Sequence, residues 1–351
     1  MRQALIILAA ALLSSTAMAE QTGFDSDAMD VGEPVISHNI AVVPLFTKKA
    51  APYDEYIVLE EAQTSKAVRI AESKGGQVDK LVVKNQDTDR RPLYLLGGEI
   101  VLGGKQDRMV VNDTVVDAAT TKELEVRCVE QGRWEGADLS FHSSEAVAHP
   151  DLRKAALFKG QGDVWNEVAR KSSASQVSST TGTYRRVLQD KAVRERIKGY
   201  LDELQAKIPR NERLTGLAVA INGNLEVVDL FDSPRLYAKL ERKLLASYVL
   251  AALERQPGSI AKAKAYDAKA RKLGKANVDV LLKGGDSSQA SNNALGSVRG
   301  TGDLATGPGV TVEAQGTRVQ SKTGPSKVFF HKGKAVHGTY FGTDAAPDKD
   351  E

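Results

Sequence analysis

The chain has little cysteine and few aromatic residues, and both shortages exclude classes of protein. Its single cysteine, Cys128, cannot form a disulfide within the chain, so the fold depends on its core and not on covalent cross-links. Aromatic residues make up 5% of the 351 residues, which argues against extended surfaces for stacking bases or sugars. The 48 Lys and Arg side chains are interspersed with 45 Asp and Glu and form no basic stripe, so we expect no nucleic-acid partner.

Long apolar runs are also missing beyond the N-terminus, which predicts a mature chain without a transmembrane segment. The N-terminus itself has a basic Arg2, an apolar run at residues 4–13 and the small-residue pattern Ala17-x-Ala19. This order is typical of a secretory signal peptide. We therefore expect a signal peptide at residues 1–19, cleavage after Ala19, and a periplasmic or secreted protein; the alternative is an uncleaved anchor. Residues 20–34 are polar and aperiodic and are expected to form a flexible leader.

Short β-type runs dominate the first half of the chain, separated by Gly, Asn and Asp residues that are typical of turns. They lie at residues 40–46, 56–60, 80–85, 92–96, 99–102, 109–111, 114–116 and 124–128. Residues 64–73 fit either a strand or a short helix. This half is predicted to be an antiparallel sheet or sandwich.

The second half changes to a helical period and then returns to strands. Helices are predicted at residues 165–171, 184–208, 233–255 and 260–273, and β-type runs at 310–312, 327–331 and 335–341. A hairpin is predicted at residues 217–228, where Asn222-Gly223 supplies the positive φ angles of a tight turn. The predicted class is therefore α+β: a β-rich N-terminal half, central helices, and C-terminal strands that return to a sheet.

Two divisions of the mature chain are compatible with this pattern. Residues 35–341 form either one α+β domain or two intertwined lobes at about residues 35–145 and 160–341. Residues 284–309 are rich in Gly, Ser, Asn and Thr and are expected to form a flexible loop. The acidic residues 342–351 are expected to be a disordered tail.

Charged and polar side chains gather around two glycine-rich connections of the β-rich half. The proposed ligand-binding residues are Lys105, Gln106, Arg108, Arg133 and Trp134, and the candidate catalytic carboxylates are Glu99 and Glu130. The cations would neutralise an anionic ligand, Gln106 would orient it, and Trp134 would provide a flat wall. The alternative is a pair of tight turns that are held together by ion pairs, because loops serve both purposes.

These residues also carry a resemblance to a known family. The segments Gly104-Lys105-Gln106-x-Arg108 and Cys128-Val129-Glu130-x-Gly132-Arg133-Trp134 resemble the signature of a domain family named for its genomic association with ADP-ribosylglycohydrolases and rhodanese-phosphatase proteins. The resemblance extends over residues 35–341, through Asp229-Leu230-Phe231-Asp232 and Val336-His337. It implies a link to ADP-ribose or NAD-derived chemistry by gene context, and no established activity.

Cys128 and the histidines offer little evidence of further chemistry. Strand alternation places Leu124, Val126 and Cys128 on one face, which favours a buried inert thiol over a reactive one, although nearby arginines could activate it. The five histidines form no His-x-x-x-His pair, so no metal site is predicted. The glycine-rich stretches fail the requirements of phosphate and dinucleotide loops, so no cofactor is predicted either.

Three functions remain open from the sequence. The first is a protein that binds a small anionic or nucleotide-like ligand through the Gly/Lys/Gln/Arg rim. The second is a hydrolase of phosphoester or ADP-ribose-type substrates with Glu99 or Glu130 as general base, which requires a raised carboxyl pKa. The third is a structural or envelope-associated protein in which the rim only locks two loops together. The oligomeric state is not determined by the sequence.

Overall fold

The computed structural model describes residues 24–49, 55–73, 77–134, 139–275, 277–278, 317–321, 324–332 and 334–342. The expected signal peptide at residues 1–19, the glycine-rich loop at 284–309, the β-type run at 310–312 and the tail beyond Gly342 lie outside the described residues. Among the described helices, none combines the length and the apolar character needed to cross a membrane.

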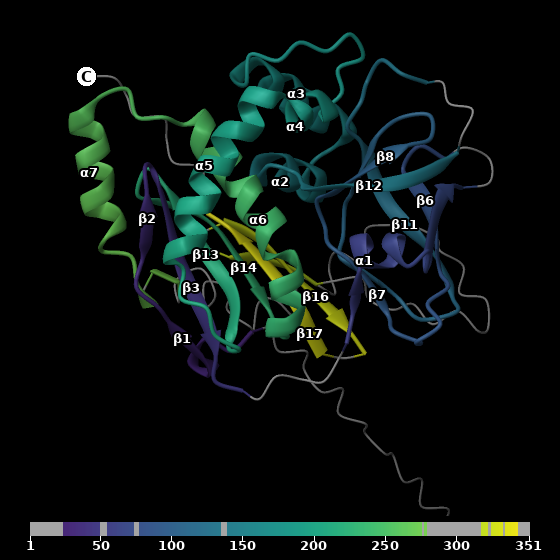
Figure 1. Cartoon of the computed structure of the whole chain (residues 1–351), viewed down its shortest axis with the longest axis horizontal. Coiled ribbons are helices and arrows are strands. Elements are labelled where there is room, and N and C mark those ends of the chain that lie inside the picture. Colours follow the sequence, from purple (N-terminus) through teal and green to yellow (C-terminus); the bar gives the residue numbers. More distant parts are fainter. Residues whose placement is uncertain are drawn as a thin grey trace, which may run out of the picture.

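One eight-stranded antiparallel sheet brings together segments from both ends of the chain (Figure 1). Its strands, in spatial order, are β1 (Met29–Val31), β3 (Ile40–Thr47), β13 (Leu214–Ile221), β14 (Asn224–Phe231), β17 (Lys334–Phe341), β16 (Gly324–His331) and β15 (Thr317–Ser321), and β2 (Val35–Ser37) pairs with β3. The predicted hairpin lies at its centre, where Asn222 (φ 53°) and Gly223 (φ 72°) form the turn between β13 and β14. The C-terminal strands therefore return to the sheet as predicted.

A closed β-barrel is inserted in the chain between β3 and β13. Its strands, in spatial order, are β11 (Thr121–Cys128), β6 (Lys80–Asn85), β5 (Val68–Glu72), β12 (Ser140–Val147), β8 (Glu99–Gly103) and β9 (Arg108–Val110). A three-stranded sheet of β10 (Thr114–Val116), β7 (Leu93–Leu95) and β4 (Ile57–Val58) adjoins it. Apolar side chains fill the barrel, among them Ile70, Val83, Val101, Leu124 and Phe141. The interior is therefore a packed core and not a channel.

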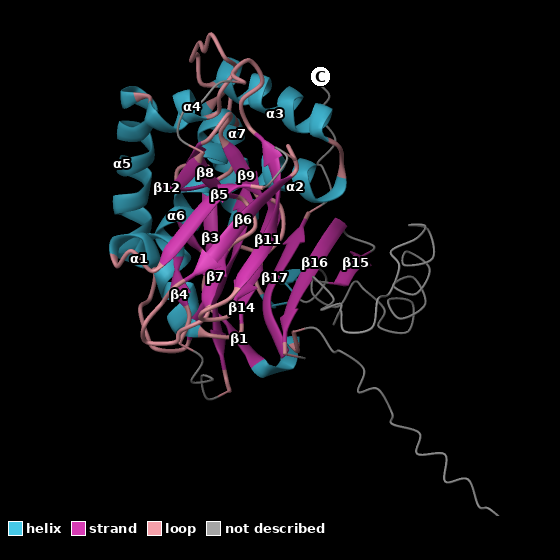
Figure 2. Cartoon of the chain, turned by 90° about the vertical axis from the view of Figure 1, so that its right-hand side faces the viewer, coloured by secondary structure: helices cyan, strands magenta, loops and turns pink. Residues whose placement is uncertain are grey.

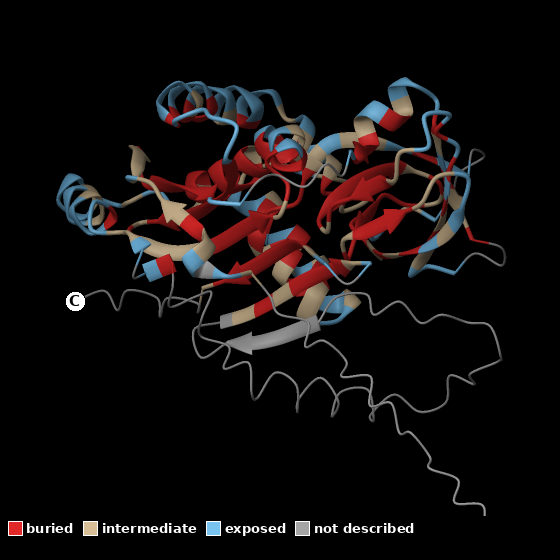
Figure 3. Ribbon diagram, turned by 90° about the horizontal axis from the view of Figure 1, so that it is seen from below, coloured by how far each residue is buried: buried red, intermediate tan, exposed pale blue. Residues whose placement is uncertain are grey.

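Helices cover the sheet and connect it to the barrel (Figure 2). They are α1 (Leu59–Thr64), α2 (Pro150–Phe158), α3 (Gln161–Ala174), α4 (Arg185–Gln189), α5 (Lys191–Lys207), α6 (Pro234–Glu254) and α7 (Ile260–Ala270), with a short 3-10 helix at Ser26–Ala28. Helix α6 packs on β13 and also contacts β12 of the barrel. The buried residues form a sheet lobe and a barrel lobe that lie side by side (Figure 3).

The α+β class is confirmed, and the differences from the expected elements have local causes. The predicted β-type run at residues 56–60 stops early, because α1 begins at Leu59 after only two strand residues. The single helix predicted at residues 184–208 is divided at Asp190, whose carboxylate accepts a hydrogen bond from the Val193 backbone N–H (2.9 Å) and caps α5. Within the expected leader, Met29–Val31 pair with β3 as strand β1. Strand β12 and helix α2 were not predicted.

A buried polar network joins the two lobes. Arg153 on α2 makes two hydrogen bonds to the carboxylate of Asp229 on β14, at 2.9 and 2.8 Å. The ring of His337 on β17 lies between two carboxylates, with Nε2 3.0 Å from Asp229 and Nδ1 2.6 Å from Asp113 of the barrel lobe. Tyr248 on α6 also donates to Asp229. The network therefore fixes the position of the barrel on the sheet.

This network predicts a loss of stability in mildly alkaline solution. Burial opposes a charge on His337, but the carboxylates of Asp113 and Asp229 outweigh it and raise the pKa to about 9. A histidine whose folded pKa is raised above its ordinary value near 6.5 stabilises the fold fully below that value, and the contribution is lost as the pH rises through about 9. The free energy of unfolding should fall by about 3 kcal/mol across this window. Urea denaturation between pH 6 and pH 10 measures the change.

The matched variant for this measurement is His337→Gln, which keeps a hydrogen-bonding side chain but does not titrate. Its stability should change much less between pH 6.5 and pH 9 than that of the natural protein. The raised pKa of Glu99, at about 7, affects stability mainly at lower pH and is present in both proteins. Equal slopes above pH 7 in the two proteins would refute the assignment of the effect to His337.

Candidate functional site

The two glycine-rich connections singled out in the sequence meet at one end of the barrel. The first joins β8 to β9 and the second follows β11. The backbone N–H of Val129 donates to the carbonyl of Asp107 (3.1 Å), and the backbone N–H of Asp107 donates to the carboxylate of Glu130 (3.1 Å). Lys105, Gln106 and Arg108 therefore lie on the same side of the molecule as Glu130 and Trp134.

We name the place where the two connections meet, residues 103–108 and 128–134, the junction. Most of its charged groups are engaged with one another. Arg133 donates from Nε to the Glu130 carboxylate (2.9 Å) and from Nη1 to the Gly104 carbonyl (2.7 Å). Asp107 accepts hydrogen bonds from Thr183 (3.0 Å) and from Nε of Arg185 (2.8 Å), which lie at the start of α4. These contacts fasten both connections to the helical segment that follows α3.

The pKa of Glu130 reflects this engagement. Burial by itself would raise the pKa of the Glu130 carboxyl, but hydrogen bonds from Arg133, Thr181 and the Asp107 backbone lower it below its ordinary value. A carboxylate that is stabilised in its ionised form is a weak general base. The geometry therefore favours a structural role for Glu130 over proton transfer.

Gln106 and Arg108 point into the interior of this junction. Arg108 is fully buried, and its Nη1 donates to the backbone and side-chain oxygens of Gln106, at 2.9 and 3.2 Å. The Gln106 amide donates in turn to the Gln131 carbonyl (3.3 Å). Arg108 Nη2 lies 3.8 Å from the Glu72 carboxylate. Neither side chain faces the solvent.

Lys105 and Trp134 form the outward part of the same junction. The Lys105 ammonium lies 5.1 Å from the centroid of the Trp134 ring, within the range of a cation–π contact. The Trp134 side chain is 50% exposed, whereas most large apolar side chains of the described residues are buried. Together they present a flat ring and a positive charge to the solvent, and we name them the outer pair.

Glu99 lies apart from this junction, at the contact between the barrel and α6. Its carboxylate contacts the Lys243 ammonium and accepts a hydrogen bond from the Leu96 backbone N–H (3.1 Å). Burial raises the pKa of Glu99 to about 7, against the opposing influence of Lys243. Of the two candidate carboxylates, Glu99 is the one with the pKa of a general base.

Cys128 occupies the buried face of β11, with Leu124 and Val126. Its Sγ lies 3.7 Å from the Val78 carbonyl, and burial raises the pKa of the thiol above its ordinary value. Thiolates react and thiols do not, so this environment favours the inert form. The neighbouring Arg108 and Arg127 reduce the shift without reversing it.

A second cluster was not recognised in the sequence. The ligand atoms of His149, Asp151 and Glu254 lie within 4.8 Å of one another, which is close enough to hold a metal ion. The Lys171 ammonium already lies between the two carboxylates, 2.9 Å from Asp151 and 2.7 Å from Glu254. His149 Nδ1 accepts a hydrogen bond from the Asp151 backbone N–H (3.0 Å) and so caps α2. Lysine therefore supplies the positive charge that a metal ion would supply.

The fold and these contacts define an α+β domain in which an inserted barrel is fastened to a sheet-and-helix lobe by buried ion pairs. Residues 28–341 match the ARG and Rhodanese-Phosphatase-superfamily-associated Protein domain, and the chain belongs to this family. The suspected family is thereby confirmed over nearly the whole described structure. No curated protein and no solved structure matches the chain.

The junction predicts that its inner and outer residues respond differently to substitution. Arg133→Met keeps most of the apolar stem but leaves the buried Glu130 carboxylate without its guanidinium, which should lower the free energy of unfolding by about 2–4 kcal/mol. Lys105→Met removes a charge that is directed to the solvent and should change stability by less than about 0.5 kcal/mol. Urea denaturation of both variants measures the contrast, and equal effects would contradict the division.

Proposed function

We propose that this protein is an exported binding domain that holds a flat anionic ligand against Lys105 and Trp134. The observation that carries the proposal is the outer pair, a lysine ammonium 5.1 Å from the centroid of a half-exposed indole. An indole offers a stacking face to a planar ring, and a lysine offers a charge to a phosphate. A nucleotide contains both groups, so nucleotides are the ligand class that fits best.

The buried contacts of the junction support this proposal by holding the outer pair in place. Arg133 precedes Trp134 in the chain, and its guanidinium is bonded to the carbonyl of Gly104, the residue before Lys105 (2.7 Å). One hydrogen bond thus links the residues adjacent to both members of the pair. A preorganised pair loses less conformational entropy when a ligand binds. Gln106 and Arg108 would then support the site from the inside and would not contact the ligand.

A hydrolase is the alternative, and the pKa of Glu99 favours it over the other carboxylate. A pKa of about 7 allows a carboxylate to accept a proton near neutral pH. The Glu99 carboxylate is buried and contacts Lys243, so substrate would have to approach it from the contact between α1, β8 and α6. In the structural alternative, the outer pair would have no ligand at all.

Export is the second part of the proposal and is tested separately. The charge and apolar pattern of residues 1–19 supports it. When the whole chain is expressed in a bacterium with a periplasm, the protein recovered from that compartment should begin at Glu20. Intact mass spectrometry measures the N-terminus, and a cytoplasmic protein that retains residues 1–19 would refute export.

Removing the indole should abolish most of the binding. Trp134→Ala is expected to weaken the binding of ADP by about tenfold or more, because stacking on an aromatic side chain contributes about 1–3 kcal/mol per base. Calorimetric titration of ADP measures the loss. The chain has two tryptophans, so Trp165→Phe serves as the matched control and leaves Trp134 as the single fluorescent reporter.

Three outcomes of this titration separate the proposed functions. Binding to Trp165→Phe and not to Trp134→Ala supports the outer pair. Equal binding of ADP to both variants overturns the proposed role of the outer pair. Failure of ADP to bind the natural protein overturns it as well. Conversion of ADP or ADP-ribose to products by the natural protein, lost in Glu99→Gln, supports the hydrolase instead.

A further inference from the structure

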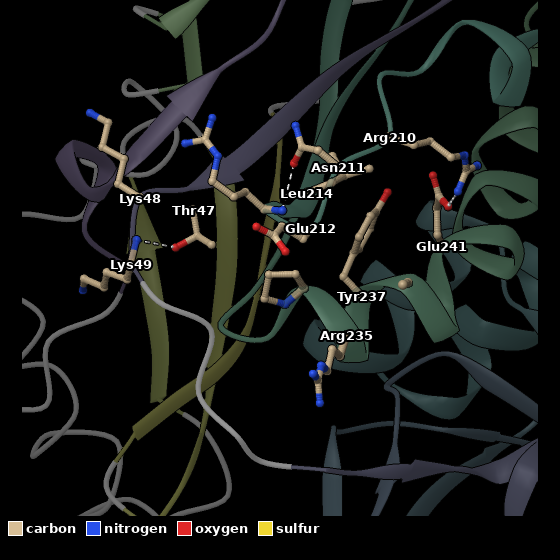
Figure 4. A pocket seen from close by; sticks show the side chains of 13 residues that line it. Thr47, Lys48, Lys49, Arg210, Asn211, Glu212, Leu214, Arg235, Tyr237 and Glu241 are labelled. Atoms are coloured by element: carbon tan, nitrogen blue, oxygen red, sulfur yellow. Dashed lines mark hydrogen bonds and ion pairs between the residues drawn. The ribbon is translucent and has the colours of Figure 1, made fainter.

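Lys327 on β16 directs its ammonium into the contact between the two lobes. The ammonium donates a hydrogen bond to the side-chain oxygen of Asn112, a barrel-lobe residue 215 positions away in the chain. Asn112 is only 8% exposed. Lysine side chains more often end in solvent, as Lys48 does in the lining of a pocket of about 620 Å³ beside α6, where it is 48% exposed (Figure 4). The contact of Lys327 is therefore unusual for a lysine.

The pleat of β16 explains why Lys327 faces the barrel lobe. Residues two apart on a strand share a face of the sheet, so the Lys327 and Phe329 side chains lie on the same side. The Phe329 ring packs edge-on against the ring of Tyr94 on β7, with centroids 6.4 Å apart. This face of β16 therefore meets the barrel lobe.

Asn112 is held in place by the residues on either side of it. The backbone N–H of Val111 donates to the carbonyl of Glu125 on β11 (3.0 Å). The carboxylate of Asp113 contacts Nδ1 of His337 on β17 (2.6 Å), the strand that pairs with β16. Asn112 is thus fixed between Glu125 and the sheet lobe.

The side-chain amide of Asn112 is bonded at both of its ends. Nδ2 donates to Oε2 of Glu125 (2.6 Å), and Oδ1 accepts from the Lys327 ammonium. An amide nitrogen can only donate and an ammonium cannot accept, so these two partners determine how the amide is turned. The other oxygen of Glu125 lies 3.3 Å from Nη2 of Arg127, which holds the carboxylate in position. An amine, a carboxamide and a carboxylate are thereby aligned.

We propose that Lys327 and Asn112 form an intramolecular isopeptide bond, with Glu125 as the catalytic carboxylate. The amine attacks the side-chain carbonyl carbon of Asn112, so that a bond forms between Nζ and Cγ and the bond between Cγ and Nδ2 breaks. The two protons that the Lys327 ammonium loses pass to the departing nitrogen, which leaves as an ammonium ion. Atoms and charge balance without an oxidant or any other reactant.

Glu125 would carry the protons between the two nitrogens. Its carboxylate already contacts Nδ2 of Asn112, the nitrogen that departs. In the tetrahedral intermediate both nitrogens are attached to the same carbon, so a carboxylate in contact with one of them is within reach of the other. It can accept a proton from the attacking amine and deliver it to the leaving group. The fixed positions of amine and amide replace a collision between two molecules.

The bond would supply the covalent link that a chain with one cysteine cannot make by disulfide formation. It would join the barrel lobe to β16 across 215 positions of the chain. Closing so long a segment reduces the conformational entropy of the unfolded chain and stabilises the fold. The inference does not involve Lys105 or Trp134, so its failure and the failure of the proposed binding function are independent.

Mass spectrometry of the natural protein tests whether the bond exists. After incubation at pH 8, the intact mass should be lower than the sequence mass by about 17 Da, the mass of ammonia. A protease digest should contain a branched peptide that joins Lys327 to Asn112. The branched peptide decides the matter, because ring closure at Asn222-Gly223 also releases ammonia. Unlinked peptides alone, with both side chains intact, would overturn the proposal.

Three variants test the roles of the residues. Lys327→Arg retains a positive charge but provides no amine, and Glu125→Gln retains the shape but cannot carry a proton, so neither should yield the branched peptide. Lys334→Arg, at an exposed position of the hairpin between β16 and β17, makes the same chemical change as Lys327→Arg and should retain the bond. An undiminished yield of the branched peptide in Glu125→Gln would refute the catalytic assignment.

The thermal stability of the same variants tests the consequence of the bond. Lys327→Arg should lower the melting temperature by about 5 °C or more, because the unfolded chain regains its full freedom. Lys334→Arg should leave the melting temperature unchanged. Equal melting temperatures of Lys327→Arg and the natural protein would contradict a covalent link between the lobes.

Discussion

The ion pair between Arg153 and Asp229 determines how the two lobes can be arranged. Both side chains have lost nearly all contact with water, at 2% and 1% exposed, and such charges are tolerated only when almost every donor and acceptor is paired. Asp229 consequently accepts from the guanidinium, from Tyr248 and from the ring of His337. Because these partners come from α2, α6 and β17, their elements are held in one arrangement. Gly98, which directly precedes β8, allows Arg153 to pack against the barrel lobe. A Cβ at this position would lie 2.7 Å from the Arg153 side chain, and the backbone has φ +99°.

The requirement that buried charges be paired also explains why the polar residues at this end of the barrel divide into a buried group and a solvent-exposed group. The carboxylates of Glu130 and Asp107 lie where water is largely excluded, so each must be neutralised by a cation, and Arg133 contacts both. Trp134 directly follows Arg133, and Lys105 lies two residues before Asp107, yet both remain in contact with solvent, where no internal partner is required. A position at the surface, and not chemical type, decides which residues of this motif are available to a ligand.

Much of the fold could be predicted because it depends on local patterns. Short β-type runs matched the bounds of β6 and β10, Asn222-Gly223 located the central hairpin, and the helix predicted from residue 233 matched α6, where Ser233 is the N-cap and Pro234 the first helical residue. Strand β12 was missed because its apolar residues are few, with Phe141 and Val147 buried and most of the others not. Its pairing with β8 and β5 is determined by distant segments. The partners of Arg153 could not be found either, since Asp229 and Thr339 are 76 and 186 residues away.

The candidate site also depends on contacts between distant segments, which the sequence does not reveal. The sequence grouped Lys105 and Arg108 with Glu130 and Trp134 in one hypothetical rim, and in the structure the pairing of β9 with β11 places the two connections together. The sequence could not distinguish a guanidinium directed inward, as in Arg108, from an ammonium directed outward, as in Lys105. In a chain whose charges are interspersed, folding alone decides which charged side chains are paired and which meet the solvent, so the electrostatic character of a site is a property of the tertiary structure.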